Sequence, residues 1–235
     1  MLTINIEEGT VIPIDKPYGW TSADVVRKVK FLLQKKTGQK KIKVGHAGTL
    51  DPLATGLLLL CIAKATKLAD SLQAEEKEYI ADIRFGATTP SFDLEKEIDA
   101  HYPFEHINKE VVEQILPQFT GVQEQVPPVF SAKLIDGKRA YELARAGKEA
   151  EMKPAKITIS ELTLLNCAIP DVVIRIICSK GTYIRSLARD LGLALQSGGH
   201  LTGLRRTRSG HYHVAEAFDM ETVENMIKNM EILKK

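Results

Sequence analysis

The sequence has little cysteine, and its three cysteines are not arranged to bind a metal or to form a disulfide. Cys61, Cys167 and Cys178 are odd in number and contain no CxxC pair. Each lies in an apolar run typical of a buried strand, where cysteine behaves as a small hydrophobic residue. The sequence therefore predicts no disulfide framework, no zinc site and no other cofactor.

Long apolar runs are also missing. The longest, residues 57–63, is far shorter than the roughly 20 residues that a transmembrane helix needs, and the N-terminus lacks the basic-then-apolar order of a signal peptide. We therefore expect a soluble cytoplasmic protein that does not contact the membrane. The 235 residues, 44% of them hydrophobic, include no internal repeat or linker, so one domain over 1–235 is the simplest prediction.

Acidic residues are absent from one long stretch. Between Asp24 and Asp51 the only charged residues are basic, namely Arg27, Lys28, Lys30, Lys35, Lys36, Lys40, Lys41 and Lys43. A second basic block runs over 175–208, whereas 93–113 is mainly acidic. Separated blocks of this kind favour one basic face for a polyanion and one acidic, solvated face.

Hydrophobic spacing predicts helices and strands that alternate irregularly. Thr21 and Asp24 form a capping box before a helix over 22–35. Strands are predicted at 11–14, 56–64, 79–85, 157–165 and 172–178, and further helices from Thr66, from Asn108, over 140–146 and over 221–233. Another helix is predicted from Gly181-Thr182, with an apolar stripe at Ile184, Leu187, Leu191 and Leu195 and an end at Gly198-Gly199. Without a regular βαβ repeat, this order favours an α+β fold with a mixed, mostly antiparallel central sheet flanked by helices.

One glycine-rich stretch, GHAGTLDPLATG at 45–56, places Asp51 directly after the basic run. It lacks the GK[ST] ending of a phosphate-binding loop. A carboxylate on a loop stiffened by Pro52 suits a nucleophile or a base, although an Asp in a turn can also simply bond its own backbone. His46 could contact a base or a phosphate, and no metal-ligand spacing surrounds Asp51.

Two further stretches carry basic residues beside aromatic ones. SKGTYIRSLARD at 179–190 combines Lys180 at a helix N-terminus with Arg185 and Arg189 one turn apart, which suits an anion site or an ordinary exposed helix face. LRRTRSGHYH at 204–213 suits a nucleic-acid backbone with unstacked bases, or an exposed basic hairpin.

Together these motifs resemble those of the TruB family of pseudouridine synthases, which modify uridine 55 of tRNA. The resemblance covers most of residues 10–215 and rests on seven blocks in the family's order: IDKPYGWTS at 14–22, GHAGTLDPLATG at 45–56, KATKL at 64–68, KEY at 77–79, GKRAYE at 137–142, SKGTYIRSLARDLG at 179–192 and LRRT at 204–207. It implies the pseudouridine synthase fold, with an RNA-contacting insertion at about 125–155.

The resemblance also implies a role for each site residue. Asp51 corresponds to the catalytic aspartate, Tyr79 stacks on the target base, and Arg185 pairs with Asp51 while contacting the flipped nucleotide. His46, Tyr183, Leu204 and Lys16 correspond to positions that bind substrate or lie near the site. Basic residues of the charged blocks are predicted to contact the RNA backbone, namely Lys40, Lys41, Lys43, Arg205 and Arg206.

The implied reaction converts uridine 55 in the TΨC loop to pseudouridine, after the base has left the stack, through an aspartate-dependent rearrangement of the glycosidic bond. Attack on the sugar, attack on the base and a glycal route all remain open. The implied partner is the TΨC stem-loop of tRNA, bound by a monomer with no obligate protein partner. The alternatives are a synthase that acts on ribosomal RNA and a non-catalytic RNA-binding or RNA-folding protein.

The chain departs from the family pattern in three places. Many members continue into a C-terminal PUA-type RNA-binding domain, whereas this sequence stops soon after the predicted terminal helix, so we expect a short form. In the loop at 88–96, Pro90 and Lys96 stand where the family commonly has Asp and Gly. Lys133 comes one residue earlier than the usual lysine, and we assign it no role.

Overall fold

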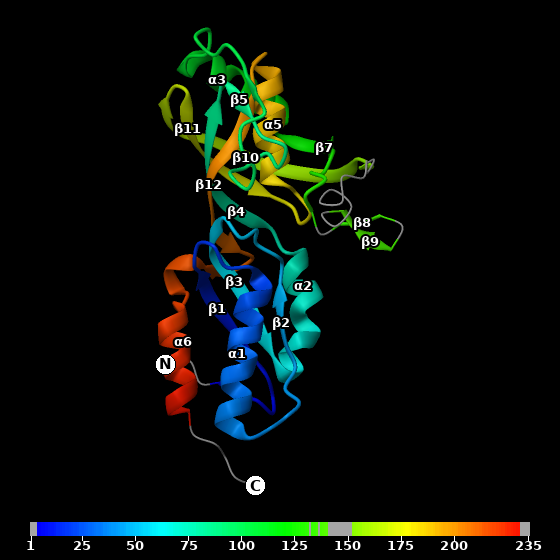
Figure 1. Cartoon of the computed structure of the whole chain (residues 1–235), viewed down its shortest axis with the longest axis vertical. Coiled ribbons are helices and arrows are strands. Elements are labelled where there is room, and N and C mark those ends of the chain that lie inside the picture. Colours follow the sequence, from blue (N-terminus) through cyan, green and yellow to red (C-terminus); the bar gives the residue numbers. More distant parts are fainter. Residues whose placement is uncertain (1–3, 132, 136, 141–151, 231–235) are drawn as a thin grey trace. The chain divides into compact units, whose positions relative to one another are not determined.

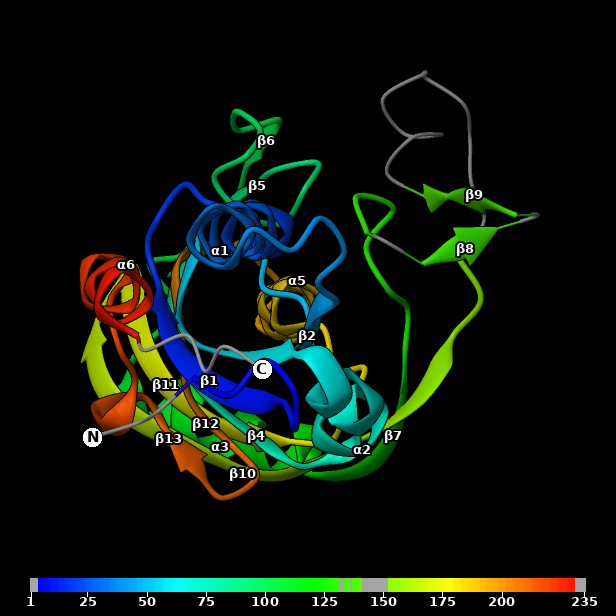
Figure 2. The same cartoon turned by 90° about the horizontal axis from the view of Figure 1, so that it is seen from below.

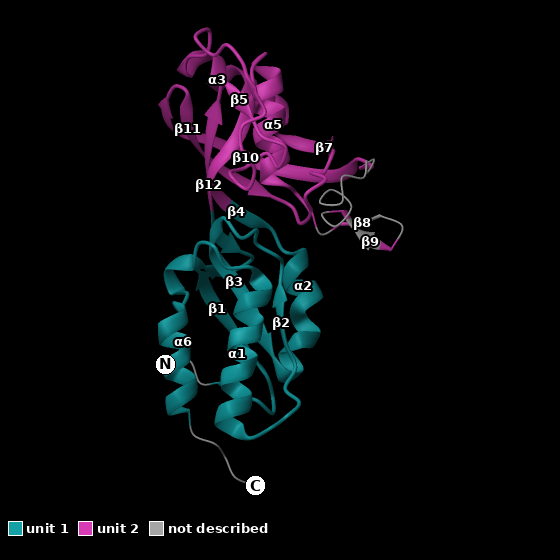
Figure 3. Cartoon of the chain, in the orientation of Figure 1, with its two compact units in different colours: residues 1–78, 205–235 teal, residues 79–204 magenta. Residues whose placement is uncertain are grey.

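The computed structural model describes residues 4–131, 133–135, 137–140 and 152–230 (Figure 1). The chain forms two compact units: residues 1–78 and 205–235 make unit 1, and residues 79–204 make unit 2 (Figure 3). In chain order, unit 2 is an insertion within unit 1. One catalytic domain over 1–235 stays a prediction, because a single domain can contain two compact units. No described helix is both long and apolar enough to cross a membrane.

Unit 1 is built around a strand that is buried on both faces. This strand, β3 (Ala54–Ile62), pairs antiparallel with β1 (Thr10–Lys16) and with β2 (Val44–Ala47), and its residues from Leu57 onward are fully buried. The apolar run therefore forms the central strand that the sequence predicts. The unit also contains α1 (Ser22–Thr37), η1 (Ala63–Leu68), α2 (Ala69–Ala74), β13 (Tyr212–His213), η3 (Val214–Glu216) and α6 (Met220–Asn229).

Helix α1 has the N-terminus that the sequence predicts. The Thr21 side chain accepts a hydrogen bond from the Asp24 backbone, and the Asp24 side chain accepts one from the Thr21 backbone, which completes the capping box. The helix ends at Thr37, where Gly38 adopts the left-handed conformation. Its buried residues, Val25, Val29 and Leu33, share one face, and α1 packs beside α6 and β2 (Figure 2).

Unit 2 contains a sheet with the strand order β12-β4-β11-β10-β7. These strands are β12 (Gly199–Ser209), β4 (Lys77–Phe85), β11 (Asp171–Cys178), β10 (Ala155–Ala168) and β7 (Gly121–Gln125), and the ends of β12 and β4 continue into unit 1. Both β10 pairings are antiparallel. Two short hairpins, β5 (Ala87–Thr88) with β6 (Ala100–His101) and β8 (Leu134–Ile135) with β9 (Lys138–Arg139), lie outside the sheet.

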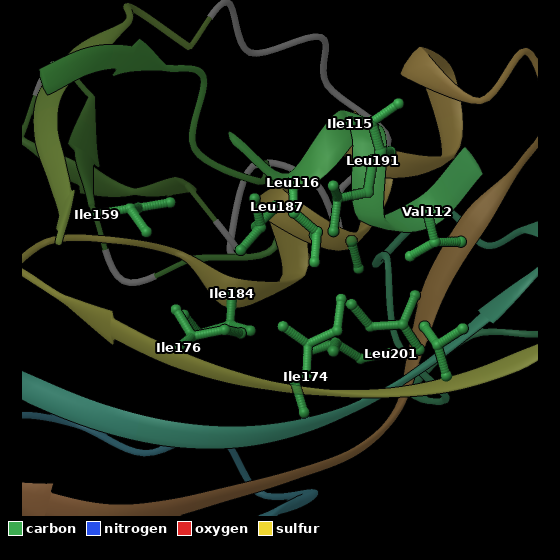
Figure 4. Close-up of a cluster of buried hydrophobic side chains, with 14 of the residues drawn as sticks. Val112, Ile115, Leu116, Ile159, Ile174, Ile176, Ile184, Leu187, Leu191 and Leu201 are labelled. Atoms are coloured by element: carbon green, nitrogen blue, oxygen red, sulfur yellow. The ribbon is translucent and has the colours of Figure 1, made fainter. Parts of the chain in front are cut away.

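Helices α3 (Lys109–Ile115) and α5 (Ile184–Ala194), with the short η2 (Leu116–Phe119), supply the core of unit 2. The predicted apolar stripe of α5 is buried at Ile184, Leu187 and Leu191, which face Ile174 and Ile176 of the sheet (Figure 4). Asn108 caps α3 as predicted. Of the other predicted helices, 140–146 lies almost entirely outside the described residues, and the terminal helix, predicted to reach residue 233, ends at Asn229 because Met230 is extended.

The sequence predicts that Gly198-Gly199 ends this helix, but in the structure the helix ends earlier. The helix ends at Ala194, where Gln196 takes the left-handed conformation and the Ser197 N–H donates to the Gly192 carbonyl. Gly198 and Gly199 instead allow close packing. A Cβ on Gly192 would overlap the backbone of Gly198 and Gly199, so the start of β12 lies directly against α5.

We therefore expect Gly192→Ala to destabilise the protein, although alanine favours helices over glycine by about 1 kcal/mol. Overpacking against backbone atoms that cannot move aside costs about 1–3 kcal/mol. The free energy of unfolding from urea titration measures the change, with Leu193→Ala, at an exposed position of the same helix, as the control. A Gly192→Ala variant as stable as the wild type would mean that β12 does not need this contact.

Candidate active site

The loop that carries Asp51 connects β2 to β3 and is fastened at several backbone positions. Ser22 Oγ accepts a hydrogen bond from the Leu50 N–H (2.9 Å) and donates to the Leu50 carbonyl (3.2 Å). The Gly19 N–H donates to the Pro52 carbonyl (2.9 Å). Gly48 and Gly56 hold positive φ angles of 95° and 97° at either side of the turn. Asp51 is thus presented on a short, restrained loop, and its side chain is half-buried.

Lys16 supports this loop from the inside. The residue is fully buried, and its Nζ donates to the carbonyls of Trp20 (2.6 Å), Pro17 (3.0 Å) and Pro52 (3.3 Å). Burial lowers the pKa of Lys16 to about 8, the Asp51 carboxylate opposes this shift, and the Arg206 guanidinium adds to it. The Lys16 ammonium therefore donates to the backbone next to Asp51 and is also attracted electrostatically by the Asp51 carboxylate.

Arg206 donates to one carbonyl before Asp51, in the loop, and to one after it, in β3. Its Nη2 donates to the Gly48 carbonyl (3.1 Å) and its Nε to the Leu57 carbonyl (2.7 Å). The side chain is only 1% exposed, and the Arg206 backbone lies so close to Gly56 that no Cβ fits there. The sequence groups Arg206 with the RNA-backbone contacts, and that role stays a prediction. In the structure its guanidinium is buried and donates to carbonyls before and after Asp51.

His46, in β2, lies on the strand that leads into this loop. It is half-buried, and its Nδ1 has no hydrogen-bond partner among the described residues. Burial lowers the pKa of His46, and the nearby Arg206 charge lowers it further. Both effects favour the neutral imidazole, and its Nδ1 is buried without a partner among the described residues.

The other basic residues predicted in unit 1 are more accessible. Lys40, Lys41 and Lys43 are exposed. Arg205 is partly exposed and forms a two-pronged ion pair with Asp15, with Nη2–Oδ2 at 2.7 Å and Nη1–Oδ1 at 3.0 Å. Among the described residues, no group of three or more His, Cys, Asp or Glu side chains is placed to hold a metal ion.

In unit 2, Arg185 is buried and not part of an exposed helix face. It is 3% exposed, and it donates to the carbonyls of Phe130 (2.9 Å, from Nη2) and Ser91 (3.3 Å, from Nη1). Its Nε also lies 3.7 Å from Asp93 Oδ2. The loop at 88–96, whose role the sequence left open, therefore holds Arg185. Asp93 is a site residue that sequence reasoning missed, and its only sequence signal was its place in that unusual loop.

The N-terminus of α5 is closed by a side chain. The Tyr183 N–H donates to Gln125 Oε1 (2.8 Å), and Gln125 Nε2 donates to the Tyr183 carbonyl (3.1 Å). Gln125, which the sequence did not single out, thus binds the backbone of Tyr183, directly before α5. Tyr79 and Leu204 pack against the core of unit 2. Lys133 donates to the Lys153 carbonyl (3.1 Å).

The predicted site residues thus form two sets. Unit 1 brings Asp51, Lys16, His46 and Arg206 together around one loop, and unit 2 contains Tyr79, Tyr183, Arg185 and Leu204. The predicted pairing of Asp51 with Arg185 joins residues of different units and stays a prediction. Each set includes buried cations that donate to backbone carbonyls, namely Lys16 and Arg206 in unit 1 and Arg185 in unit 2.

Comparison with solved structures bears on the fold. The chain is similar to a chain of the crystal structure of a Cbf5-Nop10-Gar1 complex, with a TM-score of 0.71 and 30% identity over 94% of this chain. A structure of an H/ACA RNP bound to a substrate RNA is also similar, with a TM-score of 0.68 and 28% identity. The chain spans about half the length of these solved chains (54% and 53%). The predicted pseudouridine synthase fold is confirmed.

Sequence comparisons cover nearly the whole chain. The chain is 55% identical to the tRNA pseudouridine synthase B of Phocaeicola vulgatus, over 97% of both proteins. It is 44% identical to that of Clostridium kluyveri, over 93% of this chain and 74% of the relative. Residues 34–184 match the N-terminal domain of TruB family pseudouridylate synthases, and residues 185–234 match the tRNA pseudouridylate synthase B C-terminal domain. The chain therefore belongs to the TruB family of pseudouridylate synthases.

Proposed function

We propose that this protein is a tRNA pseudouridine synthase, an isomerase that converts uridine 55 of the TΨC loop to pseudouridine, with Asp51 as its catalytic carboxylate. The observation that carries the assignment of Asp51 is the loop itself, which buried cations and backbone contacts fasten around this one aspartate. The proposal also rests on the 55% identity to a tRNA pseudouridine synthase B.

The reaction breaks the N1–C1′ bond of the target uridine and forms a C5–C1′ bond after the base has turned in the pocket. C5 gives up its proton and N1 gains one, so the atoms balance and no external reagent is consumed. Asp51 acts by attacking the sugar, by attacking the base or by removing the 2′ proton. All three routes need a preorganised carboxylate and a base extruded from the stack.

The other residues take supporting roles in this proposal. Arg185 pairs with the Asp51 carboxylate and Tyr79 stacks on the extruded base, while His46, Tyr183 and Leu204 contact the nucleotide. Extruding a base costs a few kcal/mol, which base stacking and contacts between exposed cations and phosphates offset. The protein acts in the cytoplasm, as a monomer, on the TΨC arm of tRNA.

The direct test is to incubate the purified protein with unmodified tRNA transcript, without added metal or nucleotide, and to map pseudouridine by carbodiimide treatment and primer extension. One new stop at uridine 55 is the expected result. A stop in ribosomal RNA alone would assign a different substrate. Tight tRNA binding without any modification would indicate a non-catalytic RNA-binding protein.

Asp51→Asn is expected to remove the reactive carboxylate while keeping the shape of the loop. Product formation should fall at least about a thousandfold, within the range typical for losing an acid-base or nucleophilic group, and the Kd for tRNA should change less than threefold. Single-turnover assays and filter binding measure the two quantities. Asp70→Asn, at an exposed carboxylate of α2, is the matched control. Retained turnover in Asp51→Asn would end the assignment.

Arg185→Lys is expected to lower kcat about a hundredfold and to raise the Kd for tRNA only a few fold. Lysine keeps the charge but has one nitrogen, whereas Arg185 reaches the Ser91 and Phe130 carbonyls from two separate nitrogens of a planar group. Turnover at saturating tRNA, with the melting temperature as a check on folding, measures the effect. A loss of binding as large as the loss of turnover would make Arg185 an RNA-binding residue instead.

Arg206→Lys tests whether the loop must be held for catalysis. A single ammonium cannot donate to the Gly48 and Leu57 carbonyls in the same way, so the Asp51 loop should shift slightly. Since a displacement of 1 Å can cost about a hundredfold in rate, kcat should fall at least about tenfold with KM nearly unchanged. An effect on KM alone would favour the RNA-contact role that the sequence suggested.

A further inference from the structure

The outward face of α1 carries large side chains that the rest of the protein leaves exposed. Arg27, Lys30, Phe31 and Lys35 are all exposed, and Phe31 keeps 60% of its surface accessible. At 3.6 residues per turn they share one broad side of the helix, opposite the buried Val25, Val29 and Leu33. An aromatic ring this exposed, with cations on either side of it, is not explained by the packing of unit 1.

The lysine-rich loop after α1 is attached to this same face. Gln34 Nε2, from the face itself, donates to the Lys40 carbonyl (2.6 Å). The Gly38 N–H donates to the Gln34 carbonyl (2.9 Å), and the Gln39 N–H donates to Thr37 Oγ1 (3.2 Å). The loop therefore turns back toward the helix. Arg27, Lys30, Phe31, Lys35 and Lys40 are here named the α1 face.

The charges of the α1 face are almost entirely uncompensated. Arg27 pairs with Asp24, but Lys30, Lys35 and Lys40 form no ion pair within the described residues. Their neighbours Lys28 and Lys36 are instead engaged by α6, through Glu224 and the Lys228 carbonyl. A positive surface centred on an aromatic ring complements RNA, whose phosphates attract the cations and whose bases or sugars pack on the ring.

The α1 face lies well away from the catalytic loop. Ser22, the first residue of α1, is hydrogen-bonded to Leu50, directly before Asp51. At a rise of about 1.5 Å per residue, Phe31 lies about 14 Å and Lys35 about 20 Å farther along the helix. These side chains therefore cannot touch the nucleotide at Asp51, and an RNA that they contact must extend away from the target base.

We propose that the α1 face binds the tRNA outside the TΨC stem-loop, through phosphate contacts from Lys30, Lys35 and Lys40 and packing by Phe31. The inference rests on the proposed function and names a substrate contact that the catalytic residues do not provide. It also gives a physical reason for the long basic run before Asp51, which the chemistry at Asp51 does not require.

The test compares Phe31→Ala and the triple change Lys30→Ala, Lys35→Ala and Lys40→Ala with the wild type. Leu193→Ala and Lys109→Ala, at exposed positions of unit 2, are the matched controls. Kd at several salt concentrations and KM are measured with full tRNA and with an isolated TΨC stem-loop. The triple variant should make the negative slope of log K against log salt shallower by about 2–3. Phe31→Ala should raise the Kd for full tRNA at least about fivefold.

Both defects should be larger for full tRNA than for the stem-loop. Unchanged Kd and salt slope with full tRNA would overturn the proposal. Equal defects with both RNAs would overturn the proposed location of the contact outside the TΨC stem-loop. A wild-type protein that modifies neither RNA would instead contradict the proposed function, while the Kd for tRNA would still test the α1 face.

Discussion

Much of this structure depends on buried cations that donate to backbone carbonyls. The segment from Gly48 to Leu57, which contains the Asp51 loop and the start of β3, holds positive φ angles at both of its glycines, and some of its carbonyls accept hydrogen bonds from side chains. Lys16 and Arg206 satisfy several of them from inside the fold. Burying these charges carries a desolvation cost, which the lowered pKa of Lys16 reflects. In return, the loop is held in one shape around Asp51.

Two other buried cations of the candidate site also donate to backbone carbonyls. One is Lys77, two residues before Tyr79, whose ammonium donates to the carbonyls of Leu72 and Gln73 in α2. Arg185 holds the irregular segments around Ser91 and Phe130. An enzyme that must expel water and receive an extruded base needs such segments to be rigid in advance, because rigidity acquired on binding would cost affinity.

The basic residues therefore have two separate uses. Buried cations such as Arg206 satisfy backbone groups inside the fold. Exposed cations such as Lys30 and Lys40 form no ion pair within the described residues and can release counterions when RNA binds. The first set holds the loop that carries Asp51, and the second, on the α1 face, is the one that we propose binds RNA at a distance from that loop.

The sequence by itself determined the fold class, the main helices and strands, and the family, because hydrophobic periodicity, capping residues and ordered motifs are local properties of the chain. It also singled out Asp51, whose loop motif is contiguous. Only the tertiary structure decided which cations are buried, since Arg205 and Arg206 are adjacent in sequence but differ in exposure. It likewise revealed Asp93 and Gln125, whose partners Arg185 and Tyr183 lie far away in the chain. Burial and long-range hydrogen bonds depend on how distant segments pack, and no local pattern encodes that packing.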